Sequence, residues 1–401
     1  MTNGVAILGV PIDSLRMEQA VQRIEEFVQE RSFHQIATAN VDFLASAVVN
    51  PEYREILRRC DLVLADGMPL VLASRLLGHA LLERVTGSDL VPRLAALSRR
   101  RGYGIFLLGA QPDVCAAAAL RMADMGARIV GRLSPPVGTI DATADEEILD
   151  AIEKANPDIL LVALGSPKQE IWIDRNRHRL KVPVCVGIGG ALDFISGKFG
   201  RAPVWMQRAC LEWCYRLWQE PRRLAPRYLK DALFMARYFT VQLAVSAVKP
   251  RSGQTLRMGV ESIGPVTILN ASGMMTGSRL AQLERAAINV AEKSEALVIS
   301  LTGVSYLGAD GIRTLARLHG VTKRNRFWLA GPRPALVRTL RASCCEELTQ
   351  LVVPSVLDAV RQASPECLQP RLELAADVER TANDARITTL RKPRSTADVA
   401  A

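Results

Sequence analysis

The stretch NPDILLVALGSPKQE, residues Asn156–Glu170, carries the pattern on which the fold prediction rests. Ile159–Leu164 is a short, continuous apolar run, which is typical of a strand buried on both faces. The residues after it resemble a capping box, with Ser166 as N-cap, Pro167 at the first helical position and Gln169 three residues after the cap. A strand followed at once by a capped helix is the repeating unit of a parallel α/β sheet.

The same unit recurs on both sides of this stretch, from Met1 to about Leu192. The other predicted strands are Gln35–Ala39, Leu62–Ala65, Gly104–Gly109, Arg128–Val130 and Val184–Ile188. Amphipathic segments such as Met17–Gln29 and Asp145–Ala155 separate them. This alternation predicts a Rossmann-like parallel sheet with helices on both faces, within a domain of residues 1–200.

Length and composition agree with a globular protein of several domains. The chain has 401 residues, of which 49% are hydrophobic and 23% charged, and these proportions exclude global disorder. Eight Cys without a CxxC pair are too sparse for a disulfide scaffold and favour a reduced compartment. We find neither a signal peptide nor a run of the ~18 apolar residues that a spanning helix needs. The net charge of +10 indicates an anionic partner.

Half of that charge lies in a segment of residues 201–248, which we interpret as an appendage rich in Arg and Trp. Between Arg201 and Arg237 there are eight Lys or Arg and three acids. Three Trp are interleaved with them, and Pro221 and Pro226 are expected to divide the segment into short helices. Such a run is often only a solvated helix face. The aromatic residues favour a diphosphate or an anionic membrane surface instead, and no recognised nucleic-acid module accompanies them, so we expect no nucleic acid.

The rest of the chain predicts a second unit. Residues 249–258 have the Pro, Gly, Ser and charge of a linker. Strands at Val266–Asn270, Ala296–Ser300 and Arg326–Ala330 indicate a smaller α/β domain at residues 259–362. Residues 363–401 are polar and predicted to be a disordered tail.

Candidate site residues lie where the strands of the first domain end, because ligands of such sheets bind beyond the carboxyl ends of the strands. Asp66 follows a strand and precedes Gly67, a position that suits a general base. The alternative is an Asp that caps the following helix, and taken alone it is the commoner case. The other candidates at strand ends are Thr38, Asn40, Gly109, Gly131 and Gln169.

The sequence contains none of the common cofactor-binding or metal-binding motifs in complete form. The run Val186–Leu192 (VGIGGAL) does not complete GxGxxG, because Leu192 occupies its sixth position. There is also no GxxxxGK[ST] loop, no DxD pair and no HExxH, so neither a cofactor nor a metal is expected.

Seven motifs in the same order resemble the WecG/TagA/CpsF family of bacterial glycosyltransferases (family twenty-six), over roughly Gln35–Leu229. They are TANVDFL (Thr38–Leu44), LADGMPLVLASRLLG (Leu64–Gly78), ERVTGSDL (Glu83–Leu90), FLLGAQP (Phe106–Pro112), NPDILLVALGSPKQE (Asn156–Glu170), GGALDFISGKFGRAP (Gly189–Pro203) and LEWCYRLWQEPRRLAPRYL (Leu211–Leu229). The resemblance implies transfer of a sugar, often N-acetylmannosamine, from a UDP donor to a polyprenyl-diphosphate-linked sugar. It also implies inversion of the anomeric centre without a metal.

The resemblance assigns roles to the candidates. Asp66 matches the proposed base, and Thr38 and Asn40 match residues at the donor sugar, so Asp66 and Thr38 are the expected catalytic residues. Gln169 matches a position near the nucleotide diphosphate. The arginines implied to bind substrate are Arg201, Arg216, Arg222, Arg223 and Arg227. The family's appendage touches the membrane, so the resemblance implies a cytoplasmic protein held peripherally at the inner face of the plasma membrane and possible homo-oligomers.

The second domain resembles a STAS domain, anchored on LVISLTGVSYLGADGIRTLARLH (Leu297–His319). Members that act as phosphorylation switches carry Asp-Ser-Ser-Gly where this chain has Gly308–Gly311. Ala309 stands at the phosphoacceptor position, so a serine phosphoswitch is not expected, and Asp310 is expected to be an N-cap. We interpret the domain as a regulatory module or a docking module for a protein partner.

The leading hypothesis is therefore a glycosyltransferase of bacterial cell-surface or exopolysaccharide synthesis. The alternative is a non-catalytic scaffold that binds partners through the STAS-like domain. The set Thr38, Asp66, Gln169 and Arg201 favours the enzyme, because degeneration is expected to erode the base first. A nucleotide-dependent oxidoreductase is the third hypothesis, and the incomplete GxGxxG motif argues against it.

Overall fold

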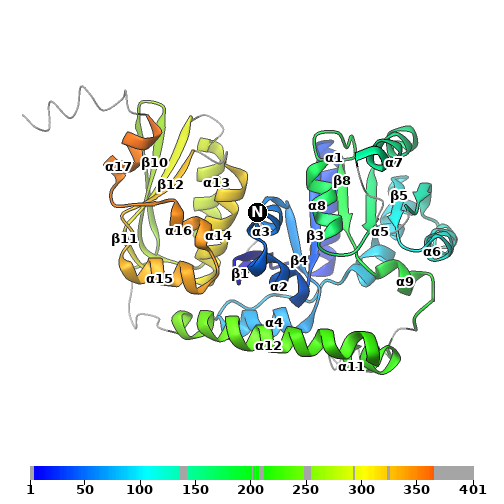
Figure 1. Cartoon of the computed structure of the whole chain (residues 1–401). Coiled ribbons are helices and arrows are strands. Elements are labelled where there is room, and N and C mark those ends of the chain that lie inside the picture. The colour runs from blue at the N-terminus through cyan, green and yellow to red at the C-terminus, as the bar shows by residue number, and fades with distance from the viewer. Residues whose placement is uncertain are drawn as a thin grey trace, which may run out of the picture.

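The computed structural model describes residues 4–135, 142–200, 202–203, 205–206, 212–247, 254–291, 294–322 and 326–364. Within these ranges, two α/β units lie side by side and one long helix runs beneath both (Figure 1). Half of the predicted linker (249–258) and nearly all of the predicted tail (363–401) lie outside the described residues.

The first unit is built on a parallel sheet, as the alternation of strands and helices predicts. Its strands are β3 (His34–Ala39), β4 (Leu62–Ala65), β5 (Gly104–Gly109), β6 (Arg128–Leu133), β7 (Ile159–Ala163) and β8 (Val184–Gly187). They are hydrogen-bonded in the order β4-β3-β8-β7-β5-β6, and every neighbouring pair is parallel. The carboxyl ends of all six strands therefore meet at one edge.

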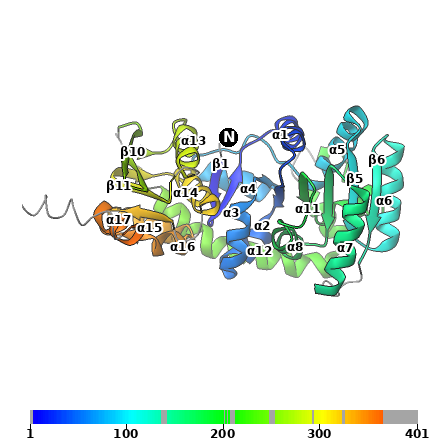
Figure 2. The same ribbon diagram turned by 90° about the horizontal axis from the view of Figure 1, so that it is seen from above.

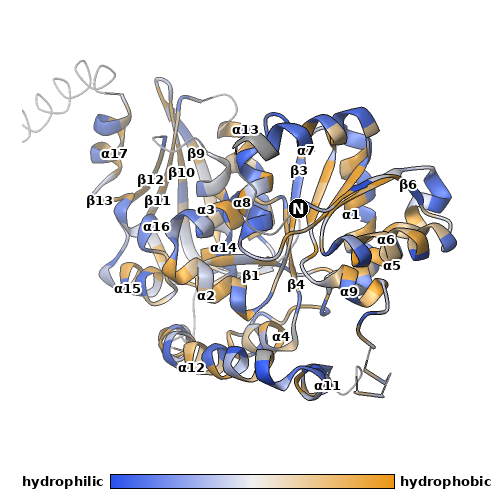
Figure 3. Cartoon of the chain, turned by 45° about the vertical axis from the view of Figure 1, so that its right-hand side comes forward, coloured by the Kyte–Doolittle hydropathy of each residue, from blue (hydrophilic) through white to orange (hydrophobic). Residues whose placement is uncertain are grey.

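Helices cover both faces of this sheet. One face packs against α1 (Met17–Glu30), α5 (Gly87–Arg101), α6 (Pro112–Asp124) and α9 (Ala191–Ile195). The other face packs against α2 (Val41–Val49), α3 (Pro51–Arg59), α7 (Ala142–Ala155) and α8 (Lys168–Arg175). Alternate residues of β5 serve the two faces, since Leu107 packs on the first and Leu108 on the second. Figure 3 shows the strands of this sheet as largely hydrophobic ribbons.

A two-stranded hairpin at the N-terminus was not predicted. Strands β1 (Gly4–Ile7) and β2 (Val10–Asp13) pair antiparallel and form a separate sheet, which packs beside β4. Leu8 and Gly9 form the turn, both with positive φ (49° and 80°). Such turns usually carry Asn-Gly or Asp-Gly, so Leu8 gives no signal of a turn in the sequence.

The appendage consists of α11 (Glu212–Gln219) and α12 (Pro221–Ser246). The expectation of short helical pieces is wrong, because α12 is one helix of 26 residues, or about 39 Å. Pro221 stands in the first turn, where no intrahelical bond is lost. The interruption at Pro226 is offset by packing, since Leu224 and Phe239 are buried on the same helix.

The second unit has its own sheet, in the order β13-β12-β11-β10-β9. Its strands are β9 (Arg257–Ile263), β10 (Val266–Met275), β11 (Ala296–Leu307), β12 (Phe327–Ala330) and β13 (Val352–Val353), and β9 alone is antiparallel to its neighbour. One face carries α13 (Leu280–Ala291), α14 (Ala309–Val321), α15 (Pro334–Ala342) and α16 (Glu346–Gln350), and the other carries α17 (Val356–Ala363). Figure 2 shows α14 beside β1 and α3 of the first unit.

Candidate active site

Asp66 directly follows β4 and lies beside the start of α5. Its Oδ2 accepts a hydrogen bond from the backbone N–H of Gly87, the first residue of α5, at 3.4 Å. Helix α4 (Met68–Leu76) takes Gly67 as its N-cap, without a capping side chain. The helix-cap interpretation of Asp66 is therefore wrong in this structure, and the carboxylate is left for another role.

The surroundings of Asp66 change the pKa of its carboxyl group. Burial raises its pKa to about 6, and the Glu212 carboxylate acts in the same direction. Arg216, the Gly87 N–H and Arg84 oppose that rise. A carboxyl group with a pKa near 6 is mostly ionised at neutral pH and accepts a proton more readily than an exposed Asp.

Two residues beside Asp66 were not predicted, Arg84 and Glu212. Arg84, in the loop before α5, donates from Nη1 to Oε2 of Glu212 at 2.9 Å. Glu212 is the first residue of α11 and is buried, so this ion pair fastens the appendage to the sheet domain. A single Arg in a loop has no periodic pattern, and its place in the ERVTGSDL motif was the only available signal.

Among the described residues of the appendage, Arg216 reaches this site. Its guanidinium lies over the Phe194 ring, 4.3 Å from the ring centre. Its Nε is buried and has no hydrogen-bond acceptor among the described residues. A cation held beside Asp66 with an unused donor can meet negative charge that develops there.

The other appendage arginines differ in placement. Arg227 forms an ion pair with Asp42, in the first turn of α2. Asp231 lies beside this pair, and burial together with Asp42 raises its pKa to about 6. Arg222 is exposed on α12. Arg201 and the side chain of Arg223 lie outside the described residues.

Thr38 and Asn40 stand at the end of β3. Thr38 is buried and donates from Oγ1 to the carbonyl oxygen of Gly187 at 2.9 Å, which ties the ends of β3 and β8 together. Asn40 is the N-cap of α2, and its Oδ1 accepts from the Phe43 N–H at 3.4 Å. Both side chains thus shape the edge of the sheet next to Asp66.

Gln169 is buried but does not belong to a capping box, so that expectation is wrong. Helix α8 starts at Lys168 with Pro167 as N-cap and no capping side chain. Gln169 Oε1 accepts from the Gly189 N–H at 3.0 Å, and its Nε2 donates to Glu170 Oε1 at 2.6 Å. Gln169 therefore links α8 to the loop that follows β8.

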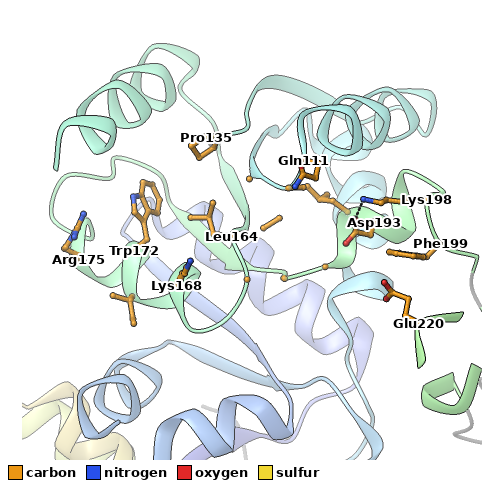
Figure 4. A pocket seen from close by; sticks show the side chains of 18 residues that line it. Gln111, Pro135, Leu164, Lys168, Trp172, Arg175, Asp193, Lys198, Phe199 and Glu220 are labelled. Atoms are coloured by element: carbon orange, nitrogen blue, oxygen red, sulfur yellow. Dashed lines mark ion pairs between the residues drawn. The ribbon is translucent and has the colours of Figure 1, made fainter. Parts of the chain in front are cut away.

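A cavity of about 670 Å³ opens at the carboxyl ends of β5, β7 and β8. That size falls within the range of small-molecule sites. In Figure 4, Lys168, Trp172 and Arg175 lie on one side of it and Asp193 and Lys198 on the other. Phe194, which stacks with Arg216, follows Asp193 in α9. The cavity and the Asp66 site thus share helix α9.

The two predicted glycines have different places. Gly109 lines the cavity with a φ of 103°, and a Cβ there would stand 2.6 Å from the Ala163 carbonyl oxygen. Gly131 lies within β6 against the Phe106 ring and is not among the described residues that line the cavity.

The described residues contain neither a metal-binding cluster nor a membrane-spanning helix. Among them, no three His, Cys, Asp or Glu side chains gather closely enough to hold a metal ion. In the same ranges, no helix combines the length and the apolar character needed to cross a membrane.

Two protein families match different parts of this chain. Residues 5–247, more than half of the chain, match the glycosyl transferase WecG/TagA/CpsF family, and residues 241–359 match the STAS domain. A crystal structure of an anti-sigma factor antagonist from Mycobacterium paratuberculosis matches 27% of this chain and 94% of its own, with 26% identity and a TM-score of 0.25.

Two curated relatives are similar to the first unit. An N-acetylglucosaminyldiphosphoundecaprenol N-acetyl-beta-D-mannosaminyltransferase of Bacillus subtilis (strain 168) is 31% identical over 235 residues, which are 57% of this chain and 90% of that protein. The protein of the same name from Bacillus spizizenii (strain ATCC 23059 / NRRL B-14472 / W23) is 36% identical over 190 residues, 47% of this chain and 72% of that protein. Because the family match spans both the sheet domain and the appendage, this chain belongs to the WecG/TagA/CpsF family of glycosyltransferases and carries a STAS domain after it.

Proposed function

We propose that the protein is an inverting, metal-independent glycosyltransferase. It moves N-acetylmannosamine or a related hexose from a UDP donor to a sugar on a polyprenyl diphosphate, in the synthesis of a bacterial surface polysaccharide or exopolysaccharide. The observation that carries the proposal is Asp66, a carboxyl group with a raised pKa placed beside two arginines at the end of β4. The names of the similar Bacillus proteins support the class of sugar and acceptor.

The proposed reaction has one displacement step. The Asp66 carboxylate accepts the proton of the acceptor hydroxyl, and that oxygen forms a bond to the anomeric carbon of the donor. The bond between this carbon and the diphosphate oxygen breaks, and the electron pair leaves with UDP. Arg216 meets the charge that develops on the diphosphate, since its Nε is unused among the described residues.

We propose that the nucleotide diphosphate occupies the 670 Å³ cavity. Gly109, Gly165, Gly189 and Gly190 let a ligand approach the backbone closely there. Lys168 and Lys198 supply positive charge on opposite sides of the same cavity.

The appendage is proposed to bind the inner face of an anionic membrane, where the acceptor lipid resides. Trp213 and Trp218 are 50% and 78% exposed, and Leu229 and Leu233 form an exposed apolar pair one turn apart on α12. Arg222 and Lys230 are exposed on the same helix. Exposed aromatic and aliphatic side chains among cations are typical of helices that lie in a membrane interface.

The test is turnover by the purified full-length protein. It is incubated with a panel of UDP-sugars and a synthetic polyprenyl-diphosphate N-acetylglucosamine, and release of UDP is measured. Asp66→Asn should abolish turnover with a productive donor. Asp113→Asn, an exposed Asp in the first turn of α6, is the matched control and should behave as wild type. Equal UDP release by Asp66→Asn and wild type would rule out this mechanism.

A further inference from the structure

The STAS domain touches the catalytic domain backbone to backbone, and glycines stand at the contacts. Gly320 lies near the end of α14, and a Cβ there would be 2.7 Å from the carbonyl oxygen of Arg58 in α3. Gly9, in the hairpin turn, lies so close to the STAS domain that a Cβ added to it would be 2.6 Å from the Cys344 carbonyl oxygen. Contacts this close leave no room for a side chain, and they fix the two domains at a defined distance.

Buried ion pairs surround these contacts. Arg313 of α14 pairs with Asp13 of β2 and, at 3.2 Å, with Glu284 of its own domain. All three side chains are buried. Arg317, one turn further along α14, pairs with Glu284 at 3.1 Å and donates to the backbone carbonyl oxygen of Cys60 at 3.2 Å.

A second group of ion pairs joins α3 to the STAS domain. Glu347 of α16 accepts from Arg54 Nε at 3.0 Å and lies 3.3 Å from Arg58 Nη1. Glu55 pairs with His319 Nδ1 of α14 at 3.1 Å. Burial alone would raise the pKa of Glu55, but hydrogen bonds and charge from His319 and Arg58 lower it to about 2. Buried charges tolerate little displacement, because a separated partner is left desolvated.

Some of these contacts connect the STAS domain to β4, the strand that directly precedes Asp66. Asp13 accepts a hydrogen bond from Arg313 at its Oδ1 atom. Its Oδ2 atom accepts a hydrogen bond from the backbone N–H of Val63 at 2.8 Å. Val63 lies in β4, three residues before Asp66. After α4, the helix that follows Asp66, His79 lies 3.2 Å from Asp310 Oδ1 at the start of α14. Asp310 is not the N-cap, contrary to expectation, because Gly308 is.

The STAS domain also holds the far end of α12. Tyr306 of β11 donates from its hydroxyl to the carbonyl oxygen of Ser246 at 3.2 Å, and α15 packs along the helix. Gln242, fully buried on α12, bonds to the hairpin through the Leu8 N–H and the Ala6 carbonyl oxygen. At its other end α12 continues from α11, which carries Glu212 and Arg216. Figure 1 shows α12 passing under both domains.

We propose that the STAS domain is a clamp within the chain. Its α14 face holds the β1–β2 hairpin, its β11 and α15 hold the end of α12, and together these contacts position Arg216 and Asp66 relative to each other. The α14 face is occupied by this chain's own catalytic domain, so a separate protein cannot use it while the clamp is closed. The effect on catalysis rests on the proposed function, whereas the effect on the structure of the appendage does not.

The test compares two glycine substitutions in the full-length protein. Gly320→Ala inserts a methyl group between α14 and α3, although Ala favours a helix over Gly. Gly259→Ala is the control, because its Cβ would meet only Asn270 of its own domain at 3.9 Å. If Gly320→Ala does not fold, Tyr306→Phe is the second probe, because it removes a single hydroxyl contact to α12. Its amide exchange is then judged in the same way as that of Gly320→Ala.

Hydrogen exchange and turnover are the readouts. Gly320→Ala should speed amide exchange in residues 4–13 and 212–246 by about tenfold and lower kcat by about fivefold, while Gly259→Ala matches wild type. Faster exchange only in α3 and α14, with wild-type exchange in α12, would overturn the proposal. Wild-type exchange in both Gly320→Ala and Tyr306→Phe would overturn it as well. The exchange measurement needs no substrate, so its outcome is independent of whether the proposed donor is correct.

Discussion

The Nη1 atom of Arg84 lies 2.9 Å from Oε2 of Glu212, and this ion pair joins the catalytic sheet domain to the appendage. Arg84 also lies 3.9 Å from Asp89, so it is held between two acids. Glu212 opens α11, and Arg216 follows it by one helical turn. The pair therefore sets the position from which Arg216 acts on Asp66.

Replacing Glu212 with Gln should make Asp66 a stronger acid. The variant keeps an oxygen for Arg84 but removes a negative charge that raises the pKa of Asp66. Since the proposed base acts in its ionised form, the acid limb of the kcat/KM profile, which reports the free enzyme, is expected near pH 6 in the wild type and should move lower in this variant. Glu153→Gln, an exposed acid on α7, is the control. An acid limb that stays in place or moves upward would contradict this account.

Replacing Arg216 with Met should shift the same limb the other way. Arg216 lowers the pKa of Asp66, so its removal should move the acid limb above about pH 6. The leaving diphosphate would also lose a cation, and kcat at pH 8 should fall by about 10²–10³-fold. Opposite shifts in Glu212→Gln and Arg216→Met are the signature to look for. Loss of activity in Arg216→Met without any change in the pH profile would mean that Arg216 does not act on Asp66.

Asp231→Asn should stabilise the appendage at high pH. Burial and Asp42 raise the pKa of Asp231 to about 6 in the folded protein, above its value near 4 in an unfolded chain. The folded state therefore loses stability as pH rises from about 4 to 6, and a neutral Asn avoids that loss. The variant should melt at a higher temperature than wild type at pH 8 and at nearly the same temperature at pH 4. Asp113→Asn is the control, and a gain that is equal at both pH values would point to another cause.

The sheet could be predicted from sequence because its strands are continuous apolar runs. Leu62–Ala65 and Gly104–Gly109 have the same bounds in the prediction and in the structure. Parallel strands place their carboxyl ends together, so Thr38 and Asp66 could be expected at one edge. The hairpin could not, because its turn begins with Leu8 in a left-handed conformation that sequence signals assign to Asn or Gly.

The rest of the site depends on partners that only the folded chain brings together. Gln169 fits a capping box in sequence, but its amide bonds to Gly189 and Glu170 because α8 begins later than expected. Arg227 resembles a diphosphate ligand in a basic segment, yet Asp42 pairs with it. The spacing of residues in the sequence predicts which of them share a helix face. It does not predict which acid from a distant part of the chain pairs with an arginine on that face.

Removing the apolar pair Leu229 and Leu233 should weaken membrane binding. Both are 63% exposed on α12, and their burial in a lipid interface is favourable by about 1.5–3 kcal/mol for a fully buried Leu. Leu229→Ser with Leu233→Ser should reduce partitioning onto vesicles of phosphatidylglycerol by about tenfold or more. Leu120→Ser, at a leucine on α6 that is 68% exposed, is the control. Unchanged partitioning of the double variant would place the membrane contact elsewhere.

Glu170, in α8, tests how the residues at the carboxyl ends of the parallel strands are held in place. Its side chain is buried, accepts from Gln169 Nε2 at 2.6 Å and lies 3.2 Å from the Tyr53 hydroxyl. Burial raises its pKa to about 8, against a value near 4 in an unfolded chain. The folded state therefore keeps a proton that the unfolded chain releases, and stability falls with rising pH between about 4 and 8 by up to about 1.4 kcal/mol per pH unit.

Glu170→Gln is neutral at every pH, so its melting temperature should match wild type near pH 4 and exceed it increasingly up to pH 8. Glu170→Ala leaves Gln169 without its acceptor and should be less stable than Glu170→Gln throughout this range. A constant difference between Glu170→Gln and wild type across that range would show that Glu170 is already ionised in the folded protein.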